Sequence, residues 1–271
     1  MDLDSFKYFT PILESVRMAD KKRVLITGSS GLIGGVIRNK LGDEYDFSGV
    51  DFNHEPGFDP HVADMTDLDT ILPAFEGIDT VIDLAAQAEN TTEWSRIKEN
   101  NLPSTFNAFE AARRAGVKRL IFASSNHVTG MYECDDPYAA IVAGKYDGID
   151  ADNIPQISID MPIRPDGPYG IGKAFGEATG RYYSDEFGLS VICLRIGSLV
   201  KESRPLNIRA FATLFHHDDL AQLVRRCIDA PDSLRFDIFY GVSGNTWRFW
   251  DISHARDVVG YVPTIDAESW R

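Results

Sequence analysis

Residues 23–34 read RVLITGSSGLIG, and this stretch decides the fold of the chain. Its first five residues form a short apolar run that predicts a strand, and residues 32–41 predict the helix that follows. Gly28, Gly31 and Gly34 permit unusual backbone angles, and their missing side chains let a phosphate approach the backbone at the helix N-terminus. An ordinary strand-to-helix turn has a similar pattern, so the downstream residues must discriminate between the two.

The rest of the sequence repeats this alternation of short apolar strands and helices. Further strands are expected at 47–50, 62–64, 80–84, 118–123, 190–195 and 236–240. Helices are expected at 67–75, at 93–115 with an interruption or kink near Pro103, at 169–187 and before Gly260. Continuously apolar strands that alternate with helices indicate a parallel sheet covered on both faces. The predicted fold class is α/β, a doubly wound parallel sheet of the Rossmann type with a small C-terminal substrate-binding lobe.

Three parts of the chain are expected to have separate roles. Residues 1–20 form an N-terminal extension whose apolar residues have roughly helical spacing, which suits packing on the body or on a partner subunit. Residues 21–197 form the dinucleotide-binding domain. Within it, residues 131–165 break the alternation and are expected to form a lid-like insertion, because connections of that length are usually functional. Residues 198–271 form the substrate-binding lobe.

The composition argues against several classes of partner. The 271 residues carry a net charge of −14, with 41 acidic and 27 basic side chains, which opposes binding to nucleic acid or an anionic membrane. No apolar stretch approaches the roughly 20 residues that cross a bilayer, and the acidic N-terminus does not resemble a signal peptide. The distant cysteines Cys134, Cys193 and Cys227 match no metal or redox spacing. We therefore expect reduced thiols, no bound metal and a cytoplasmic location.

The second strand is expected to end at Asp51, whose carboxylate is placed to accept hydrogen bonds from both hydroxyls of an adenosine ribose. The same charge repels the 2′-phosphate of NADP, and residues 52–54 offer no Arg to hold that phosphate. NAD is therefore the expected cofactor, with NADP as the alternative. Asp64 and Met65 are expected either to frame the adenine or to form a surface turn.

Tyr169 and Lys173 lie four residues apart on an expected helix, so their side chains share one face. A free phenol has a pKa of about 10, and the ammonium beside it, with a positive nicotinamide ring, is expected to lower the pKa of Tyr169. The ionised Tyr169 would take the proton of a substrate hydroxyl while the carbon releases hydride. Ser125, at the carboxyl end of the fifth strand, is the candidate partner of the reacting oxygen, and His127 is either a substrate contact or structural.

These residues together resemble the extended short-chain dehydrogenase/reductase family, from about residue 22 to the end of the chain. The stretches FASSNH at 122–127, RPDGPYGIGK at 164–173 and LRIGS at 194–198, with Arg209 ahead of His217, are most similar to the uronate dehydrogenase branch. That branch also includes archaeal sugar dehydrogenases. Its members oxidise the C1 hydroxyl of a cyclic sugar to a lactone with a nicotinamide cofactor.

The resemblance implies specific roles for individual side chains. Ser125, Tyr169 and Lys173 would form the catalytic set, and Asn101 would steady the lysine through a water. Arg209 would pair with a carboxylate or phosphate at the far end of the substrate, since a guanidinium binds either bidentately. The expected sugar-binding residues are Gln87, Ser125, Asn126, His127, Ser198 and Arg209. The expected cofactor-binding residues are Gly28, Ser30, Gly31, Leu32, Ile33, Gly34, Asp51, Asp64, Met65, Leu84, Ala85, Ala86, Tyr169, Lys173 and Ile196.

Three functions are compatible with these residues and with the family resemblance. The leading hypothesis is an NAD(P)-dependent sugar 1-dehydrogenase that acts on an aldose, a uronate or a sugar phosphate. A nucleotide-sugar epimerase or dehydratase is the second, although only 74 residues follow Gly197 to enclose a nucleotide. A non-catalytic NAD(H)-binding sensor is the third. The resemblance also implies a homo-oligomer, a dimer or higher, in which the helices at 100–116 and 169–187 pair.

Overall fold

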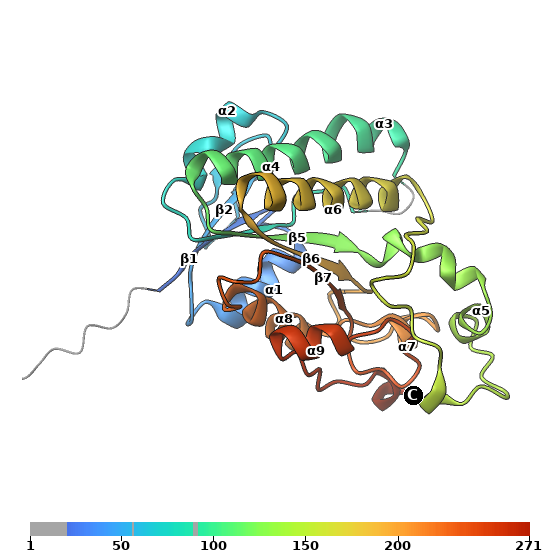
Figure 1. Ribbon diagram of the computed structural model, residues 1–271. Helices are drawn as coiled ribbons and strands as arrows, with labels where there is room; N and C mark the ends of the chain where they lie inside the picture. Colours follow the sequence, from blue (N-terminus) through green and yellow to red (C-terminus); the bar gives the residue numbers. More distant parts are fainter. Residues whose placement is uncertain (1–20, 56, 89–91) are drawn as a thin grey trace, which may run out of the picture.

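One parallel sheet of seven strands organises the part of the chain that this computed structural model describes, residues 21–55, 57–88 and 92–271 (Figure 1). The strands are β1 (Arg23–Thr27), β2 (Asp46–Asp51), β3 (His61–Val62), β4 (Thr80–Asp83), β5 (Arg119–Ser125), β6 (Ser190–Ile196) and β7 (Phe236–Gly241). Their order across the sheet is β3-β2-β1-β4-β5-β6-β7, and every neighbouring pair is parallel. The predicted extension at 1–20 lies outside the described residues.

Helices cover both faces of this sheet, which confirms the predicted doubly wound α/β class. The α-helices are α1 (Leu32–Leu41), α2 (Leu68–Ile71), α3 (Trp94–Arg96), α4 (Leu102–Ala115), α5 (Tyr138–Val142), α6 (Pro168–Phe187), α7 (Ala210–Thr213), α8 (His217–Ile228) and α9 (Ser253–Val259). Figure 1 shows α4 and α6 side by side on one face, with α1, α8 and α9 on the other. Alternate β1 residues therefore face two separate cores, Val24 and Ile26 on the α1 side and Leu25 on the α4 side.

One predicted strand differs from the structure. The third strand was expected at 62–64 but ends at Val62, because the Asp64 side chain accepts hydrogen bonds from the Thr66 N–H and hydroxyl, both at 2.8 Å, and turns the chain.

The long helix expected at 93–115 is interrupted near Pro103, as predicted. The interruption is a π-helical turn, Ile97–Asn101, and Pro103 lies in the first turn of α4 directly after it.

Residues 131–165 pack against the C-terminal part of the chain. They contain α5 and short 3₁₀ turns at Gly130–Cys134 and Ala151–Asn153; other 3₁₀ turns are at Leu72–Phe75, Asn126–Val128 and Ala267–Trp270. Ile157 exchanges backbone hydrogen bonds with the strand-like segment around Trp250, from Ile157 N–H to Phe249 at 2.7 Å and from Asp251 N–H to Ile157 at 3.0 Å. Ile157 and Trp250 belong to one buried cluster. The division into domains stays a prediction.

The helices predicted to pair in an oligomer carry exposed aromatic side chains. Phe106 of α4 is 46% exposed, and Phe175, Tyr182 and Phe187 of α6 are 37%, 54% and 45% exposed. Tyr183 between them is buried and stacks on Phe109 with ring centroids 5.5 Å apart, so it belongs to the core. The oligomeric state stays a prediction.

A buried ion pair joins α6 to the sheet. Arg195 of β6 donates from Nε and Nη2 to the two carboxylate oxygens of Glu177, both at 2.9 Å. The Ser124 hydroxyl of β5 donates to the same carboxylate at 2.6 Å, and Arg195 Nη1 reaches the Tyr240 hydroxyl at 3.2 Å. The Arg195 and Glu177 side chains are 2% and 7% exposed. Side chains from β5, β6, β7 and α6 therefore meet at one buried ion pair.

Replacing Glu177 by Gln is expected to destabilise the protein by about 3–5 kcal/mol, because the Arg195 charge would stay buried without its partner. Asp185→Asn is the matched control, since Asp185 pairs with Arg181 on the same helix at 2.7 Å but both side chains are more than half exposed. We expect the control to change stability by about 0.5 kcal/mol. Urea unfolding of both variants measures the difference, and equal losses would contradict a structural role for the buried pair.

Candidate active site

A cavity of about 660 Å³ opens at the carboxyl ends of β1, β2 and β4. It lies where the strand order reverses between β1 and its neighbour β4, the usual ligand position in open α/β sheets. The lining residues are Gly28, Ser30, Gly31, Leu32, Ile33, Gly34, Asp51, Phe52, Asn53, Met65, Leu84, Ala85, Ala86, Gln87, Ala88, Asn100, Asn101, Ser104 and Leu199. The shape and position suit an elongated ligand laid across the strand ends.

The glycine-rich turn is shaped by close backbone approach. Gly28 has a φ of +64°, and a Cβ there would meet Ala85 Cα at 3.0 Å. At Gly34 a Cβ would meet the Ser29 carbonyl oxygen at 2.4 Å, so only glycine lets α1 begin this close to the turn. In the described residues no side chain caps α1, whose N-cap is Gly31. Its first N–H groups are therefore available to an anion.

Asp51 holds the glycine-rich turn at the end of β2. One of its carboxylate oxygens accepts from the Ser30 N–H at 2.9 Å, and the other accepts from the Asn53 N–H at 3.3 Å. The carboxylate is part of the cavity lining. It is thus fixed in direction while lone pairs remain for a ligand's hydroxyl groups.

Most of the predicted cofactor-binding residues line this cavity, and four do not. Tyr169, Lys173 and Ile196 lie outside the lining, as does Asp64, whose side chain closes its own turn through Thr66. The structure adds lining residues that the sequence did not indicate, among them Ser104 and Leu199. Leu199 follows β6, whose carboxyl end lies at the same sheet edge, and this is the one signal that would have placed it.

Tyr169 and Ser125 meet beside this cavity. Ser125 ends β5 and Tyr169 lies in the first turn of α6; they are 4% and 8% exposed, and the Ser125 side chain lies near enough to Tyr169 to act on the pKa of its phenol. Lys173 is one turn further along α6, with Nζ 5.7 Å from the centroid of the Tyr169 ring. The predicted triad is therefore brought together in space.

Burial governs the pKa values of this triad in the protein itself. It raises the pKa of Tyr169 to about 12, and the Ser125 hydroxyl offsets only part of that rise. Burial likewise lowers the pKa of Lys173 to about 8, while the charge of Asp83 acts in the opposite sense. The lowered pKa of Tyr169 was expected with the ammonium and a positive nicotinamide ring acting together, and it stays a prediction.

Asp83 is a buried acid that the sequence reading missed. It ends β4, is 1% exposed, and accepts a 2.5 Å hydrogen bond from the Thr27 hydroxyl; its other carboxylate oxygen has no hydrogen-bond partner among the described residues. Burial raises its pKa to about 6, opposed by the Thr27 hydrogen bond and the charge of Lys173. The available signal was a single carboxylate at the end of an otherwise uncharged strand.

The side chain of Asn101 is hydrogen-bonded to the backbone of the loop after β4. Its amide group accepts from the Gln87 N–H at 3.0 Å and donates to the Gln87 carbonyl at 3.2 Å. The residue ends the π-helical turn before α4, a distortion that is common at functional sites. The structure therefore gives Asn101 the role of fixing Gln87 at the cavity wall, whereas the predicted contact with Lys173 stays a prediction.

Asn126 and His127 follow Ser125 in a short 3₁₀ turn. Asn126 is 3% exposed, and its amide nitrogen has no hydrogen-bond partner in the described part of the chain, so a buried donor is free for a ligand. His127 Nδ1 lies 2.7 Å from a carboxylate oxygen of Asp166, and its ring meets the Tyr169 ring edge-on with centroids 5.8 Å apart. Asp166 is a further residue that sequence reasoning did not single out.

Ser198 and Arg209 are neighbours, but Arg209 already has an acidic partner. Arg209 Nη1 donates to the Ser198 hydroxyl at 3.0 Å, and that hydroxyl is 2.8 Å from the Thr213 hydroxyl. Nε and Nη2 of Arg209 each donate at 2.6 Å to a different oxygen of Glu133. The guanidinium predicted to hold a substrate anion is therefore paired within the chain.

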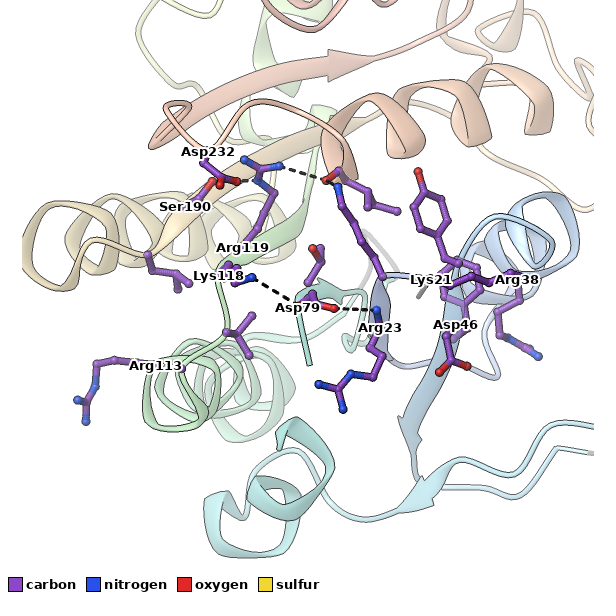
Figure 2. A pocket seen from close by; sticks show the side chains of 18 of the residues that line it. Lys21, Arg23, Arg38, Asp46, Asp79, Arg113, Lys118, Arg119, Ser190 and Asp232 are labelled. Atoms are coloured by element: carbon purple, nitrogen blue, oxygen red, sulfur yellow. Dashed lines mark hydrogen bonds and ion pairs between the residues drawn. The ribbon is translucent and has the colours of Figure 1, made fainter. Parts of the chain in front are cut away.

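A larger cavity, of about 1540 Å³, lies at the opposite edge of the sheet, where β1, β4, β5 and β6 begin (Figure 2). Its charged groups are largely engaged with the protein. Asp79 accepts from the Arg23 N–H at 3.0 Å and lies 3.8 Å from Lys118, while the Arg119 guanidinium donates to carbonyls that follow α8. Ligands of open α/β sheets bind at the carboxyl edge, so we place the chemistry in the smaller cavity.

Among the described residues, no three His, Cys, Asp or Glu side chains gather closely enough to hold a metal ion. In the same part of the chain, no helix has the length and apolarity that crossing a bilayer requires.

The sequence and the fold both match known proteins. A family model for the NAD dependent epimerase/dehydratase family matches residues 24–262. An NAD-dependent glucose-6-phosphate dehydrogenase of Haloferax volcanii is 34% identical over 89% of this chain and 92% of its own length. An L-arabinose 1-dehydrogenase (NAD(P)(+)) of the same organism is also 34% identical, over 89% of this chain and 96% of its own. A solved structure of uronate dehydrogenase from Agrobacterium tumefaciens, 31% identical, has a TM-score of 0.77 and covers 92% of this chain and 87% of that chain.

Proposed function

The chain belongs to the NAD dependent epimerase/dehydratase family, and we propose that it is an NAD-dependent sugar 1-dehydrogenase. It would oxidise the C1 hydroxyl of a cyclic aldose to the lactone, with transfer of hydride to the cofactor and release of one proton. The observation that carries the proposal is the gathering of Ser125, Tyr169 and Lys173, all buried, at the sheet edge that holds the glycine-walled cavity, in a chain whose similar relatives are named as sugar dehydrogenases.

The residues present fit a dinucleotide. The glycine-rich turn, with its left-handed Gly28, and the uncapped N–H groups at the start of α1 suit a pyrophosphate. The Asp51 carboxylate suits the adenosine ribose hydroxyls and disfavours a 2′-phosphate. Ala85 and Ala86 leave room for the ligand against the strand ends. When bound, the nicotinamide supplies the hydride acceptor.

Tyr169 is the proposed base, and its ionisation depends on the charges around it. Burial raises its pKa to about 12, so proton transfer requires positive charge that stabilises the phenolate. Lys173 is the nearby cation, and the charge of Asp83 keeps its ammonium protonated more than burial alone would. Ser125 would hydrogen-bond the reacting oxygen, and the free amide of Asn126 and the imidazole of His127 would hold the sugar.

Two alternatives predict different ligands. A nucleotide-sugar epimerase or dehydratase would bind a UDP- or GDP-sugar tightly and return NAD unchanged at the end of each cycle. A non-catalytic sensor would bind NAD(H) and turn over no sugar. The buried hydroxyls of Tyr169 and Ser125, with Lys173 close to the Tyr169 ring, favour chemistry over sensing, because a sensor needs no acid–base group there. A dimeric assembly and a cytoplasmic location remain part of the proposal.

A panel of neutral aldoses, uronates and sugar phosphates tests the proposed reaction. We expect NADH to form with at least one of them, followed as absorbance of the reduced nicotinamide, and the lactone to appear in equal amount. The same panel is run with NADP and with UDP- and GDP-sugars as competing ligands. Turnover of no sugar would reject a dehydrogenase, and tight binding of a nucleotide sugar would support the epimerase or dehydratase.

The base assignment predicts that Tyr169→Phe lowers kcat by about 10²–10⁴-fold, because the general base is lost, while NAD affinity is retained. Tyr182→Phe is the matched control, since Tyr182 is on the same helix and 54% exposed. We expect the control to keep wild-type activity. Single-turnover kinetics and NAD titration give the two readouts, and a Tyr169→Phe enzyme of normal kcat would refute the assignment.

The cofactor assignment predicts that Asp51→Ser raises the ratio of kcat/KM for NADP to that for NAD at least about tenfold, or about 1.4 kcal/mol, because a repelling charge is removed. Asp46→Ser is the control at the opposite end of the same strand, away from the candidate site. Steady-state kinetics with both cofactors measure the ratio. An unchanged ratio in Asp51→Ser would show that another feature selects the cofactor.

A further inference from the structure

The Glu133–Arg209 ion pair is a built feature of the candidate site. Both contacts are 2.6 Å and bidentate, the Glu133 side chain is 13% exposed and the Arg209 side chain 31%. A carboxylate or phosphate on a substrate would need the same Nε and Nη2 edge of the guanidinium that Glu133 already occupies. Arg209 is therefore neutralised before any ligand arrives.

This pair lies at the sheet edge that carries the triad. Ser198, which accepts from Arg209 Nη1, is two residues beyond Ile196, and Ile196 is the register partner of Ser125 across β5 and β6. Glu133 lies in the 3₁₀ turn Gly130–Cys134, which follows His127 by a few residues. Both partners are thus tied to segments that leave the sheet at the edge where Ser125 lies, and we infer that a substrate at that edge meets the pair.

The turn that carries Glu133 is firmly anchored. The Met131 N–H donates to the Arg164 carbonyl at 3.0 Å, and the Tyr132 hydroxyl donates to the Pro162 carbonyl at 3.0 Å. The Tyr132 ring is buried, and the Arg164 guanidinium lies 4.5 Å from its centroid. Since the two residues before Glu133 are held, the turn presents the Glu133 carboxylate to Arg209 in a fixed position.

We propose that Glu133 determines substrate specificity by pairing with the guanidinium of Arg209. The site then accepts uncharged aldoses and rejects uronates and sugar phosphates. An anionic substrate would bring a second negative charge against Glu133, whereas the hydroxyls of a neutral sugar can accept from the guanidinium N–H groups that remain. This inference rests on the proposed dehydrogenase activity. It replaces the sequence-based expectation that Arg209 pairs with a charged substrate.

Two matched substrate pairs test it, D-galactose with D-galacturonate and D-glucose with D-glucuronate, because each pair differs only at C6. In the wild-type enzyme we expect kcat/KM for the neutral sugar to exceed that for its uronate by at least a hundredfold. Glu133→Gln is expected to raise the uronate-to-neutral ratio at least tenfold, since it frees the guanidinium charge and keeps the side-chain shape. Glu202→Gln, an exposed change in the segment that leads to Arg209, should leave the ratio unchanged.

The wild-type ratio of kcat/KM for the neutral sugar to that for its uronate tests the inference even if Glu133→Gln does not fold. Wild-type preference for a uronate, or a Glu133→Gln enzyme with unchanged ratio and a normal melting curve, would overturn the inference while the dehydrogenase proposal stands. If neither protein turns over any sugar, the proposed function fails instead. Calorimetric titration with D-galacturonate then tests Glu133 alone: tightening of at least tenfold in Glu133→Gln supports its role, and equal affinities reject it.

Discussion

The geometry of the candidate site depends on one buried ion pair, Glu177–Arg195. Glu177 lies one helical turn after Lys173 on α6, and Arg195 immediately precedes the residue that pairs with Ser125 across the sheet. Ser124 donates to the same carboxylate, so the helix that carries Tyr169 is held against both β5 and β6 by one group. A charge pair this deep is satisfied only in one arrangement, because a shifted helix would leave either partner unpaired in an apolar surrounding. The Glu177–Arg195 pair therefore fixes both the position of α6 along the sheet and its distance from the sheet.

Three further acidic side chains lie beside basic ones near Ser125 and Tyr169. The charge of Asp83 acts on Lys173, Asp166 lies 2.7 Å from His127 Nδ1, and Glu133 forms an ion pair with Arg209. Such preformed pairs keep side chains oriented before a ligand binds, so little reorganisation is left for the reaction itself. They also leave few free charges in the site. The unsatisfied amide of Asn126 and the hydroxyls of Ser125 and Tyr169 are neutral donors, which suits recognition of an uncharged polyol.

Local patterns predicted the fold and the elements that carry the candidate site residues, because the signals lie within short windows. The apolar run before Gly28 forms β1, and Tyr169 and Lys173 lie one turn apart on α6, as expected, while the roles of these residues stay predictions. What the sequence could not predict were pairings across long separations. Glu133 meets Arg209 across 76 residues, and Asp83 meets Thr27 across 56. The effect of burial on the pKa of Tyr169 could not be predicted for the same reason, since burial is a property of the whole fold.

The cluster around Ile157 and Trp250 draws every one of its members from beyond residue 131 and none from the first four strands. Its buried members belong to neither of the two cores that flank β1, and they join the insertion at 131–165 to the C-terminal part of the chain. Substitutions among them can therefore reshape this insertion while the contacts around the glycine-rich turn are kept.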